Sequence, residues 1–252
     1  MSKCMPDVKL LTAGEYGLVI EFAAEISPAV NRLVQQVAGL LAGSSINGII
    51  EMVPTYRTIM IYFDPFMITR QELTACIERL LGGIDCESSQ VTGAKTVYVP
   101  VCYGGVLGPD LEYVARYTGL AAAEVIVLHT AVPYLIYMLG FTPGFPYLGG
   151  LPAQLTVPRQ EKPRVKVPAG SVGIGGSQTG LYPVESPGEW WLIGRTPVKA
   201  FNPKNSQPFL FSPGDYLHFY AISVDEYFAI RRQVEAGTYI PRICQGSEGD
   251  TK

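Results

Sequence analysis

The sequence contains few of the residues that carry most metal and redox chemistry. Its 252 residues include only two histidines, His129 and His218, and five cysteines. The cysteines are odd in number and no two are spaced as C-x-x-C, which argues against a disulfide framework and against a thiolate zinc site. Two histidines are too few for a histidine-rich metal centre. We therefore expect no metal site.

Charge is also scarce. Charged residues make up 16% of the chain and hydrophobic residues 48%, against a charged fraction of about 25% in typical soluble domains. Disordered chains show the opposite composition, so that class is excluded. The net charge of −3 does not fit a nucleic-acid binder, which would show clustered positive charge.

A long uninterrupted apolar run is missing too. Residues 125–158 contain no Asp, Glu, Lys or Arg, but prolines and glycines interrupt them. A membrane-spanning helix needs about 20 consecutive apolar residues, so we interpret this stretch as buried core. The first residues lack the apolar region and cleavage site of a signal peptide. We expect a cytoplasmic protein without membrane contact.

The first 92 residues alternate between predicted strands and helices. Two helix starts are marked by caps: Ser27 followed by Pro28, and the Thr69–Glu72 capping box. The order strand, helix, strand, strand, helix is that of a ferredoxin-like α+β domain. We predict strands at 16–22, 46–53 and 58–63, and helices at 28–43 and 69–82. The polar residues 87–90 end this domain.

Glycine and proline are abundant, with 27 and 20 residues, and in residues 93–252 they separate short apolar runs. Such a pattern between 133 and 220 is typical of a closed or sandwich-like β structure. Before it we predict a strand at 96–101, a helix at 111–117 capped by Asp110, and a helix at 121–128. After it, a capping box at Ser223 predicts a helix to about 235, followed by a frayed tail that starts near 243.

The glycine-rich stretch 170–180 matches no nucleotide or nucleophile motif. A P-loop needs Lys and Ser/Thr after its last glycine, where Leu181 and Tyr182 stand, and a dinucleotide fingerprint needs Gly or Ala at Gln178. A nucleophile elbow at Ser171 needs a glycine at Ala169. Turns and bulges in a small barrel, or close approach of backbone N–H groups to an anion, remain as alternatives.

Histidines and arginines supply the remaining polar candidates. His218 lies in a strand-like alternation and is interpreted as structural. His129 ends an apolar helix, where it is either functional or a hydrogen-bonded core residue. Arg195 stands isolated between Gly194 and Thr196, and a guanidinium suits a carboxylate or a phosphate. A basic cluster, with Arg159, Lys162, Arg164 and Lys166, is a weaker candidate for the same role.

The segment 141–150 places three aromatic residues, Phe141, Phe145 and Tyr147, among prolines and glycines. Rigid aromatic residues form a pocket wall, a partner contact or a core plug. Together with the charge-free residues 125–158, the segment fits a protein that exposes an apolar face to a partner.

Long motifs between residues 10 and 222 resemble, in order, the B-subunit family of bacterial 5-oxoprolinase, also known as allophanate hydrolase subunit 1 or kinase A inhibitor protein. The motifs are Tyr103-Gly104-Gly105, Gly108-Pro109-Asp110, Phe141-Thr142-Pro143-Gly144-Phe145-Pro146-Tyr147, Val167-Pro168-Ala169-Gly170-Ser171-Val172-Gly173, Gln178-Thr179-Gly180, Ser186-Pro187-Gly188 and Trp190-Trp191-Leu192-Ile193-Gly194-Arg195-Thr196-Pro197. Two positions depart from the family pattern: Glu189 replaces a usual glycine and Asn202 a usual aspartate.

The resemblance implies a ferredoxin-like domain at 1–92 and a cyclophilin-like β-barrel at 93–252. It also implies that the chain is active only with the C subunit and the A subunit, in an enzyme that uses ATP to open 5-oxoproline to glutamate. Whether ATP binds this chain is left open, and no catalytic residue is assigned. Inhibition of a sporulation histidine kinase, and a carboxyltransferase-like role in allophanate or urea processing, are the alternatives. Prolyl isomerase activity would rest on fold alone.

The residues that we expect to line a substrate or partner cleft come from the motifs above and from the polar candidates. They are His129, Phe141, Phe145, Tyr147, Arg164, Ser171, Gln178, Thr179, Tyr182, Arg195 and Thr196.

Overall fold

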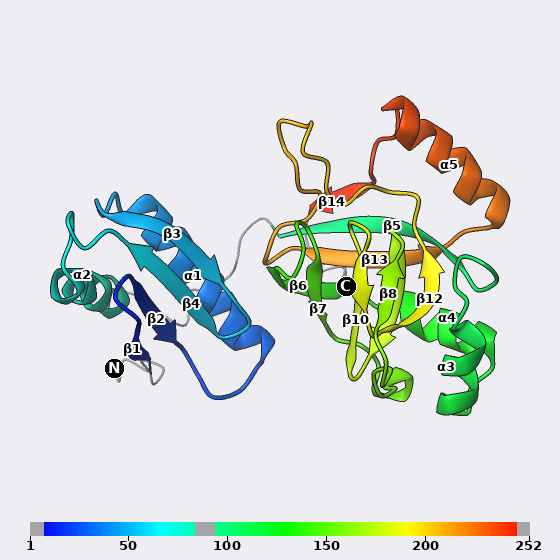
Figure 1. The fold of residues 1–252 in the computed structure, drawn as a ribbon, viewed down its shortest axis with the longest axis horizontal. Coiled ribbons are helices and arrows are strands. Elements are labelled where there is room, and N and C mark those ends of the chain that lie inside the picture. The colour runs from blue at the N-terminus through cyan, green and yellow to red at the C-terminus, as the bar shows by residue number, and fades with distance from the viewer. Residues whose placement is uncertain (1–7, 84–93, 246–252) are drawn as a thin grey trace. The chain divides into compact units, whose positions relative to one another are not determined.

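The computed structural model describes residues 8–83 and 94–245, which form two compact units within 1–92 and 93–252 (Figure 1). The predicted boundary segment 87–90 lies outside the described residues. Each unit mixes helices and strands around its own hydrophobic core. No helix in the described parts is both long and apolar enough to cross a membrane.

The first unit is a four-stranded antiparallel sheet packed against two helices. The sheet order is β1-β2-β4-β3. Alternate residues of β2 and β4, such as Ile20 and Ile61, are fully buried against apolar helix residues such as Val34 and Ile77. The elements are β1 (Lys9–Ala13), β2 (Gly17–Glu21), α1 (Pro28–Gly43), β3 (Ile49–Pro54), β4 (Thr58–Phe63) and α2 (Arg70–Gly82).

Both predicted helix starts in this unit are confirmed. The Ser27 hydroxyl accepts the N–H of Val30 at 3.2 Å, with proline in the first turn of α1. The Thr69 hydroxyl accepts the N–H of Glu72 (3.2 Å), and the Glu72 carboxylate accepts the N–H of Thr69 (2.9 Å). Each cap satisfies backbone donors that a helix leaves unpaired at its first turn.

The second unit is built on an eight-stranded sheet that curves into a nearly closed barrel. Its order is β10-β9-β12-β5-β13-β6-β7, and the end strands β7 and β10 approach each other. The strands are β5 (Lys95–Tyr103), β6 (Tyr134–Leu139), β7 (Pro146–Gly149), β9 (Ser171–Gly175), β10 (Gln178–Leu181), β12 (Trp191–Arg195), β13 (Tyr216–Ala221) and β14 (Ile243–Gln245), which also pairs with β5.

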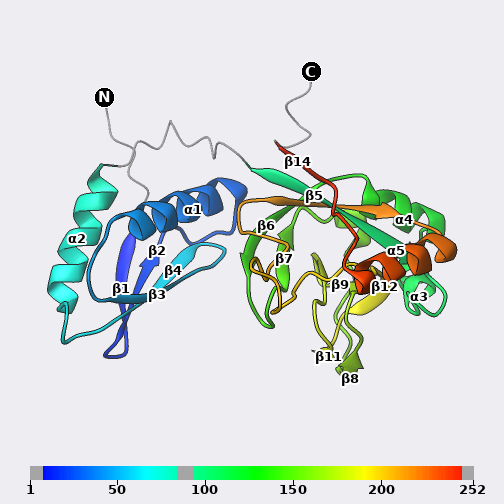
Figure 2. The ribbon, with the colours of Figure 1, turned by 90° about the horizontal axis from the view of Figure 1, so that it is seen from above.

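β5 is the central strand of this unit. It runs parallel to β13 from Thr96 to Val101, and the two strands lie side by side in Figure 1 and overlap in the view of Figure 2, where β13 is orange. β5 is almost wholly buried, whereas burial alternates along β13, with Leu217 and Phe219 buried. The remaining elements are α3 (Leu111–Thr118), α4 (Ala122–Thr130), the short 3₁₀ helix η1 (Ala153–Leu155), the β8 (Arg164–Val167) and β11 (Ser186–Gly188) pair, and α5 (Val224–Ala236).

Two terminal strands were not predicted. β1 is short and mostly exposed, with no clear alternation of burial, so its residues carry little strand signal. The frayed tail expected from residue 243 is wrong for Ile243–Gln245, which form β14 by pairing with Lys95–Val97 of β5. Three residues are too few for a periodic pattern, and this strand exists because β5 offers it an edge.

The capping role predicted for Asp110 is wrong in its detail. Asp110 occupies the position before α3, but its side chain makes no hydrogen bond to that helix. Its Oδ2 accepts the N–H of Leu192 at 2.6 Å, and its Oδ1 pairs with the Arg164 guanidinium at 2.7 Å. The carboxylate therefore joins α3 to β12 and β8.

The charge-free stretch supplies part of the core of the second unit. Of its residues, Tyr134, Ile136, Leu148 and Leu155 are almost completely buried, whereas Phe141 is 62% exposed. The interpretation as core is confirmed for its buried part, and contact with a partner through exposed apolar side chains such as Val127 and Phe141 stays a prediction. In the buried part, the lack of charge follows from burial.

Candidate functional site

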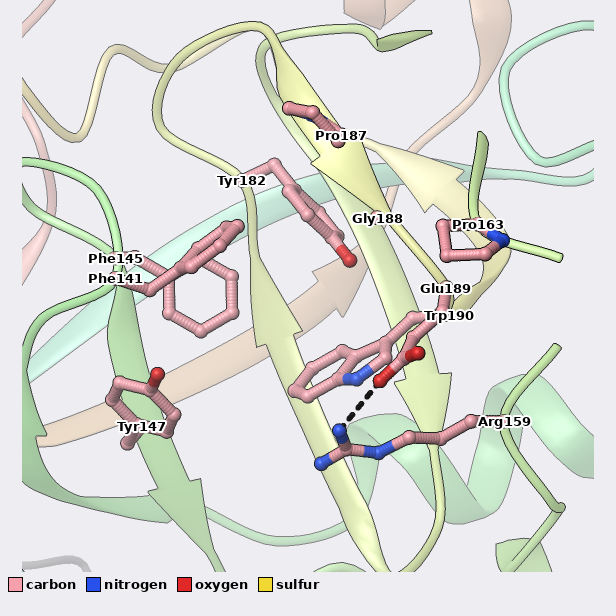
Figure 3. A pocket seen from close by; sticks show the side chains of 10 residues that line it. All are labelled: Phe141, Phe145, Tyr147, Arg159, Pro163, Tyr182, Pro187, Gly188, Glu189 and Trp190. Atoms are coloured by element: carbon pink, nitrogen blue, oxygen red, sulfur yellow. Dashed lines mark hydrogen bonds and ion pairs between the residues drawn. The ribbon is translucent and has the colours of Figure 1, made fainter. Parts of the chain in front are cut away.

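An aromatic pocket of about 290 Å³ opens on the second unit (Figure 3). It brings together segments far apart in the sequence, and four of its residues are site candidates from the sequence. The lining residues are Phe141, Phe145, Tyr147, Arg159, Pro163, Tyr182, Pro187, Gly188, Glu189 and Trp190.

Phe145 is the centre of the aromatic wall. Its ring centroid lies 5.2 Å from that of Tyr147, 5.4 Å from Tyr182 and 5.7 Å from Trp190, all edge-to-face. Phe141 packs on it from outside at 5.5 Å. Phe145 and Trp190 are 3% and 5% exposed, so the rings are held rigidly and preform the cavity.

The glycine-rich strands make room for the Trp190 indole. A Cβ atom at Gly175 would lie 2.3 Å from Cδ1 of Trp190, and one at Gly180 would lie 2.9 Å from its Cζ3. Neither distance is compatible with a side chain. The stretch forms the β9–β10 hairpin with its turn at Gly176, so the interpretation as turns in a barrel is confirmed, and binding of an anion by the backbone N–H groups stays a prediction.

An ion pair marks the polar edge of the pocket. The Arg159 guanidinium contacts the Glu189 carboxylate at 2.6 Å, and it also donates to the Gln178 side-chain oxygen at 3.3 Å. Figure 3 shows this pair beside Trp190. Arg164 donates to the Trp190 carbonyl at 3.3 Å and also pairs with Asp110. Gln178 and Arg164 thus support the pocket from its edge.

Tyr182 supplies a neutral hydroxyl. Burial raises the pKa of Tyr182 to about 12, even though a hydrogen bond from the Trp190 backbone opposes the shift. The phenol therefore stays protonated at neutral pH. Its hydroxyl points toward the pocket (Figure 3), where it can donate its proton to an acceptor.

The structure places His129 and Thr179 inside the core, away from this pocket. His129 is fully buried, with Nδ1 2.8 Å from the Tyr103 hydroxyl and Nε2 2.8 Å from Thr179 Oγ1. Thr179 donates its one proton to the Gly173 carbonyl at 3.0 Å, so Nε2 must carry the proton and Nδ1 must accept from Tyr103. Burial lowers the pKa of His129 to about 3, and the ring is neutral.

Three further candidates lie together elsewhere. Arg195 and Thr196 line a separate pocket beside α5. Ser171 is buried in β9 and pairs across the sheet with Arg195. Thr196 is also buried and accepts the N–H of Val198 at 3.2 Å.

Sequence reasoning missed several pocket residues. Trp190 belongs to a family motif, Glu189 is a departure from the family pattern and Arg159 is part of the basic cluster, but none of them is a predicted cleft residue. No local signal joins these three residues, because only the tertiary structure brings their loops together. Within the described residues, no group of three His, Cys, Asp or Glu side chains is placed to hold a metal ion.

The chain resembles named proteins over most of its length. Residues 8–211 match the carboxyltransferase domain family, subdomains C and D. The 5-oxoprolinase B subunit of Bacillus subtilis is 37% identical over 228 residues, covering 87% of this chain and 95% of that protein. The same-named protein of Escherichia coli O157:H7 is 39% identical over 208 residues, covering 82% and 92%.

Solved structures share the architecture. The crystal structure of TTHA0988 superimposes with a TM-score of 0.73 at 36% identity, covering 82% of this chain but 40% of that one. The urea amidolyase of K. lactis gives a TM-score of 0.79 at 20% identity, covering 98% of this chain and 17% of that one. The second likeness shows the fold alone.

Proposed function

Because the chain belongs to the family of 5-oxoprolinase B subunits, we propose that it works with the A and C subunits in an ATP-dependent enzyme that opens 5-oxoproline to glutamate. The observation that carries this is the 37% identity to the Bacillus subtilis protein over 95% of its length. The chain is a subunit of a 5-oxoprolinase; its dependence on ATP and on the two partners is the proposal. The use of ATP supports a location in the cytoplasm.

The aromatic pocket suits 5-oxoproline chemically. The substrate is a five-membered lactam ring with one carboxylate. Its methylene groups would pack on Phe145 and Trp190, and its carboxylate would bind the N–H groups of Arg159 that Glu189 and Gln178 do not already occupy. The protonated Tyr182 hydroxyl would donate to the lactam carbonyl. Each role uses a different part of the substrate.

The chain's own part is binding and orientation. Opening the lactam adds one water molecule across its C–N bond, and this step needs an activated carbonyl or nucleophile. Among the described residues that line the pocket there is no serine, cysteine, histidine or lysine, and His129 is buried and neutral. The A and C subunits would therefore complete the catalytic machinery, and this chain alone should not turn over 5-oxoproline.

Reconstituted enzyme tests the proposal. Purified A and C subunits with this chain should release glutamate from 5-oxoproline only when ATP is present. Arg159→Gln should raise KM at least tenfold, since it removes a charge-assisted bond worth about 1.5–3 kcal/mol. Lys162→Gln, an exposed cation in the same loop, is the matched control and should leave KM unchanged.

Three results would refute three different parts of the proposal. A complete complex without ATP-dependent glutamate release would refute the function. Full activity with an unchanged KM in Arg159→Gln would refute the pocket but keep the function. Measurable turnover by this chain alone, free of its partners, would refute the dependence on the other subunits.

The alternative functions have weaker support. The likeness to urea amidolyase rests on 20% identity, which supports a common fold and not a common reaction. No feature of the described residues favours inhibition of a histidine kinase.

We also propose finer fold assignments for the two units. In the first, β1 takes the edge position beside β2 that the last strand of a ferredoxin-like sheet occupies, so the unit would be a permuted form of that fold. In the second, the nearly closed sheet with α3 and α4 packed on it supports a cyclophilin-like barrel.

A further inference from the structure

A second pocket, separate from the aromatic one, gathers positive charge. It has a volume of about 190 Å³ and lies between the end of β12, the turn at Gly170 and one face of α5. Among the described residues, three cations line it, namely Arg195, Lys199 and Arg231. Glu235, a carboxylate in the same lining, is 2.8 Å from Nε of Arg231.

Arg195 is the oriented member of this group. Its Nε donates to the Ala169 carbonyl at 2.8 Å, which fixes the plane of the guanidinium and leaves both amino groups for a ligand. In the part of the chain that the structure describes, no carboxylate forms an ion pair with it. The side chain is half-buried, so its charge is less screened than that of an exposed arginine.

The turn beside Arg195 is built for close approach. Gly170 has a φ of +82°, and a Cβ atom there would lie 2.3 Å from the Thr196 carbonyl oxygen. Only glycine satisfies both conditions. The N–H of Thr196 donates to the Gly170 carbonyl at 2.8 Å, and this bond holds the turn against the end of β12, and with it the Ala169 carbonyl that orients Arg195.

The basic pocket continues into a larger one of about 550 Å³. The two share Val198 and Lys199, which follow β12, and Val234 on α5. Beyond Lys199 the larger pocket offers aromatic surface at Tyr239 and amide groups at Asn205, among others. The two adjoining pockets are together called the groove: the three cations line one end, and aromatic and amide groups line the other.

We infer that this groove binds a ligand that carries a phosphate chain, with the phosphates at Arg195, Lys199 and Arg231. A planar guanidinium flanked by two flexible ammonium or guanidinium groups matches several phosphate oxygens, whereas one carboxylate would use only Arg195. The phosphates belong either to a nucleotide, whose base would enter the larger chamber, or to inorganic polyphosphate.

The inference deepens the proposed function, because an ATP-dependent enzyme must hold phosphates and this groove would place them on this chain. Calorimetric titration of the full chain with ATP, with inorganic triphosphate and with 5-oxoproline tests it without any turnover. Arg195→Gln should weaken both phosphate ligands at least tenfold. Lys199→Gln and Arg231→Gln should each weaken them about two- to fivefold.

Arg232→Gln is the matched control, because Arg232 follows Arg231 on α5 but does not line the pocket. It should leave both affinities unchanged. ATP binding tighter than triphosphate would support the nucleotide, and equal affinities would support the phosphate chain alone. If Arg195→Gln does not fold, Arg195→Lys replaces it. This variant keeps the positive charge and removes the two-bonded contact that only a guanidinium can make.

Two results would overturn the inference. One is the absence of saturable binding of both phosphate ligands. The other is binding that folded Arg195, Lys199 and Arg231 variants leave unchanged. Either result beside a reconstituted enzyme that still opens 5-oxoproline with ATP would leave the proposed function standing and place the phosphates on a partner protein.

Discussion

Acidification should weaken the barrel unit by an amount set by His129. Burial lowers the pKa of this ring to about 3 in the folded chain, whereas its pKa in the unfolded chain is about 6.5. A histidine that is neutral when folded contributes full stability above pH 6.5, because neither state then binds the proton. As the pH falls toward 3 the unfolded state binds the proton first, and the contribution is lost.

The size of the effect follows from these two values. Each pH unit between them is worth about 1.4 kcal/mol. At pH 5, about 1.5 pH units below the pKa of the unfolded histidine, proton binding stabilises the unfolded state, whereas the folded ring remains almost wholly unprotonated. Lowering the pH from 7.5 to 5 should therefore remove about 2 kcal/mol of unfolding free energy through His129 alone.

Urea unfolding followed by tryptophan fluorescence measures this difference. The chain has two tryptophans, Trp190 and Trp191, and both belong to the second unit, so the signal reports that unit. His129→Gln retains polar groups but does not titrate, and it should lose about 2 kcal/mol less than the natural chain over this pH range. His218→Gln is the control for the second histidine.

Carboxylates also titrate near pH 5, and for this reason the difference between the natural chain and His129→Gln is the quantity to compare. Equal losses in both proteins would refute the buried neutral ring. If His218→Gln removed the loss instead, the effect would belong to His218 and the reasoning about His129 would be wrong.

Two further predictions concern packing in the second unit. Asp110→Ala should lower the unfolding free energy by about 3–5 kcal/mol, because it leaves the Leu192 N–H without its partner and removes the only carboxylate that pairs with Arg164 among the described residues; urea unfolding measures it. Gly175→Ala should destabilise the unit by about 1–3 kcal/mol and shift the tryptophan emission, because the added methyl group overlaps the Trp190 ring.

Each of these two predictions has a result that would contradict it. Glu112→Ala removes an exposed carboxylate from the same helix and should change stability by less than about 0.5 kcal/mol; a loss as large as that of Asp110→Ala would contradict the specific role of Asp110. An unchanged emission spectrum in Gly175→Ala would contradict the tight contact with Trp190.

Local signals in the sequence predicted the helices well. Capping residues such as Ser27 and Thr69 act within four residues of themselves, so they mark a helix start without any tertiary information. Strands that depend on a partner far away in the sequence could not be predicted in this way. Ile243–Gln245 become a strand only because β5 presents a free edge, and no property of three residues announces that.

The site was predicted in part. Aromatic residues in a proline-rich segment, such as Phe145 and Tyr147, do line the pocket. Arg159 and Glu189 carry charges that the sequence alone could not place, because their 2.6 Å contact joins two loops. His129 could not be assigned from its surroundings in the sequence, where an absence of charge fits both a catalytic cleft and a core.

The parallel pairing of β5 with β13 constrains how the protein folds during synthesis. Lys95 and Asp215, bonded at the start of this pair, are 120 residues apart in the chain. The whole first unit leaves the ribosome early in synthesis. That unit can then fold through contacts among its own residues. The central strand of the barrel, by contrast, must wait until nearly all of the second unit has emerged. During this wait, apolar residues of β5 such as Val99 have no partner on one edge, and this interval is when the chain is most open to aggregation and to chaperone binding.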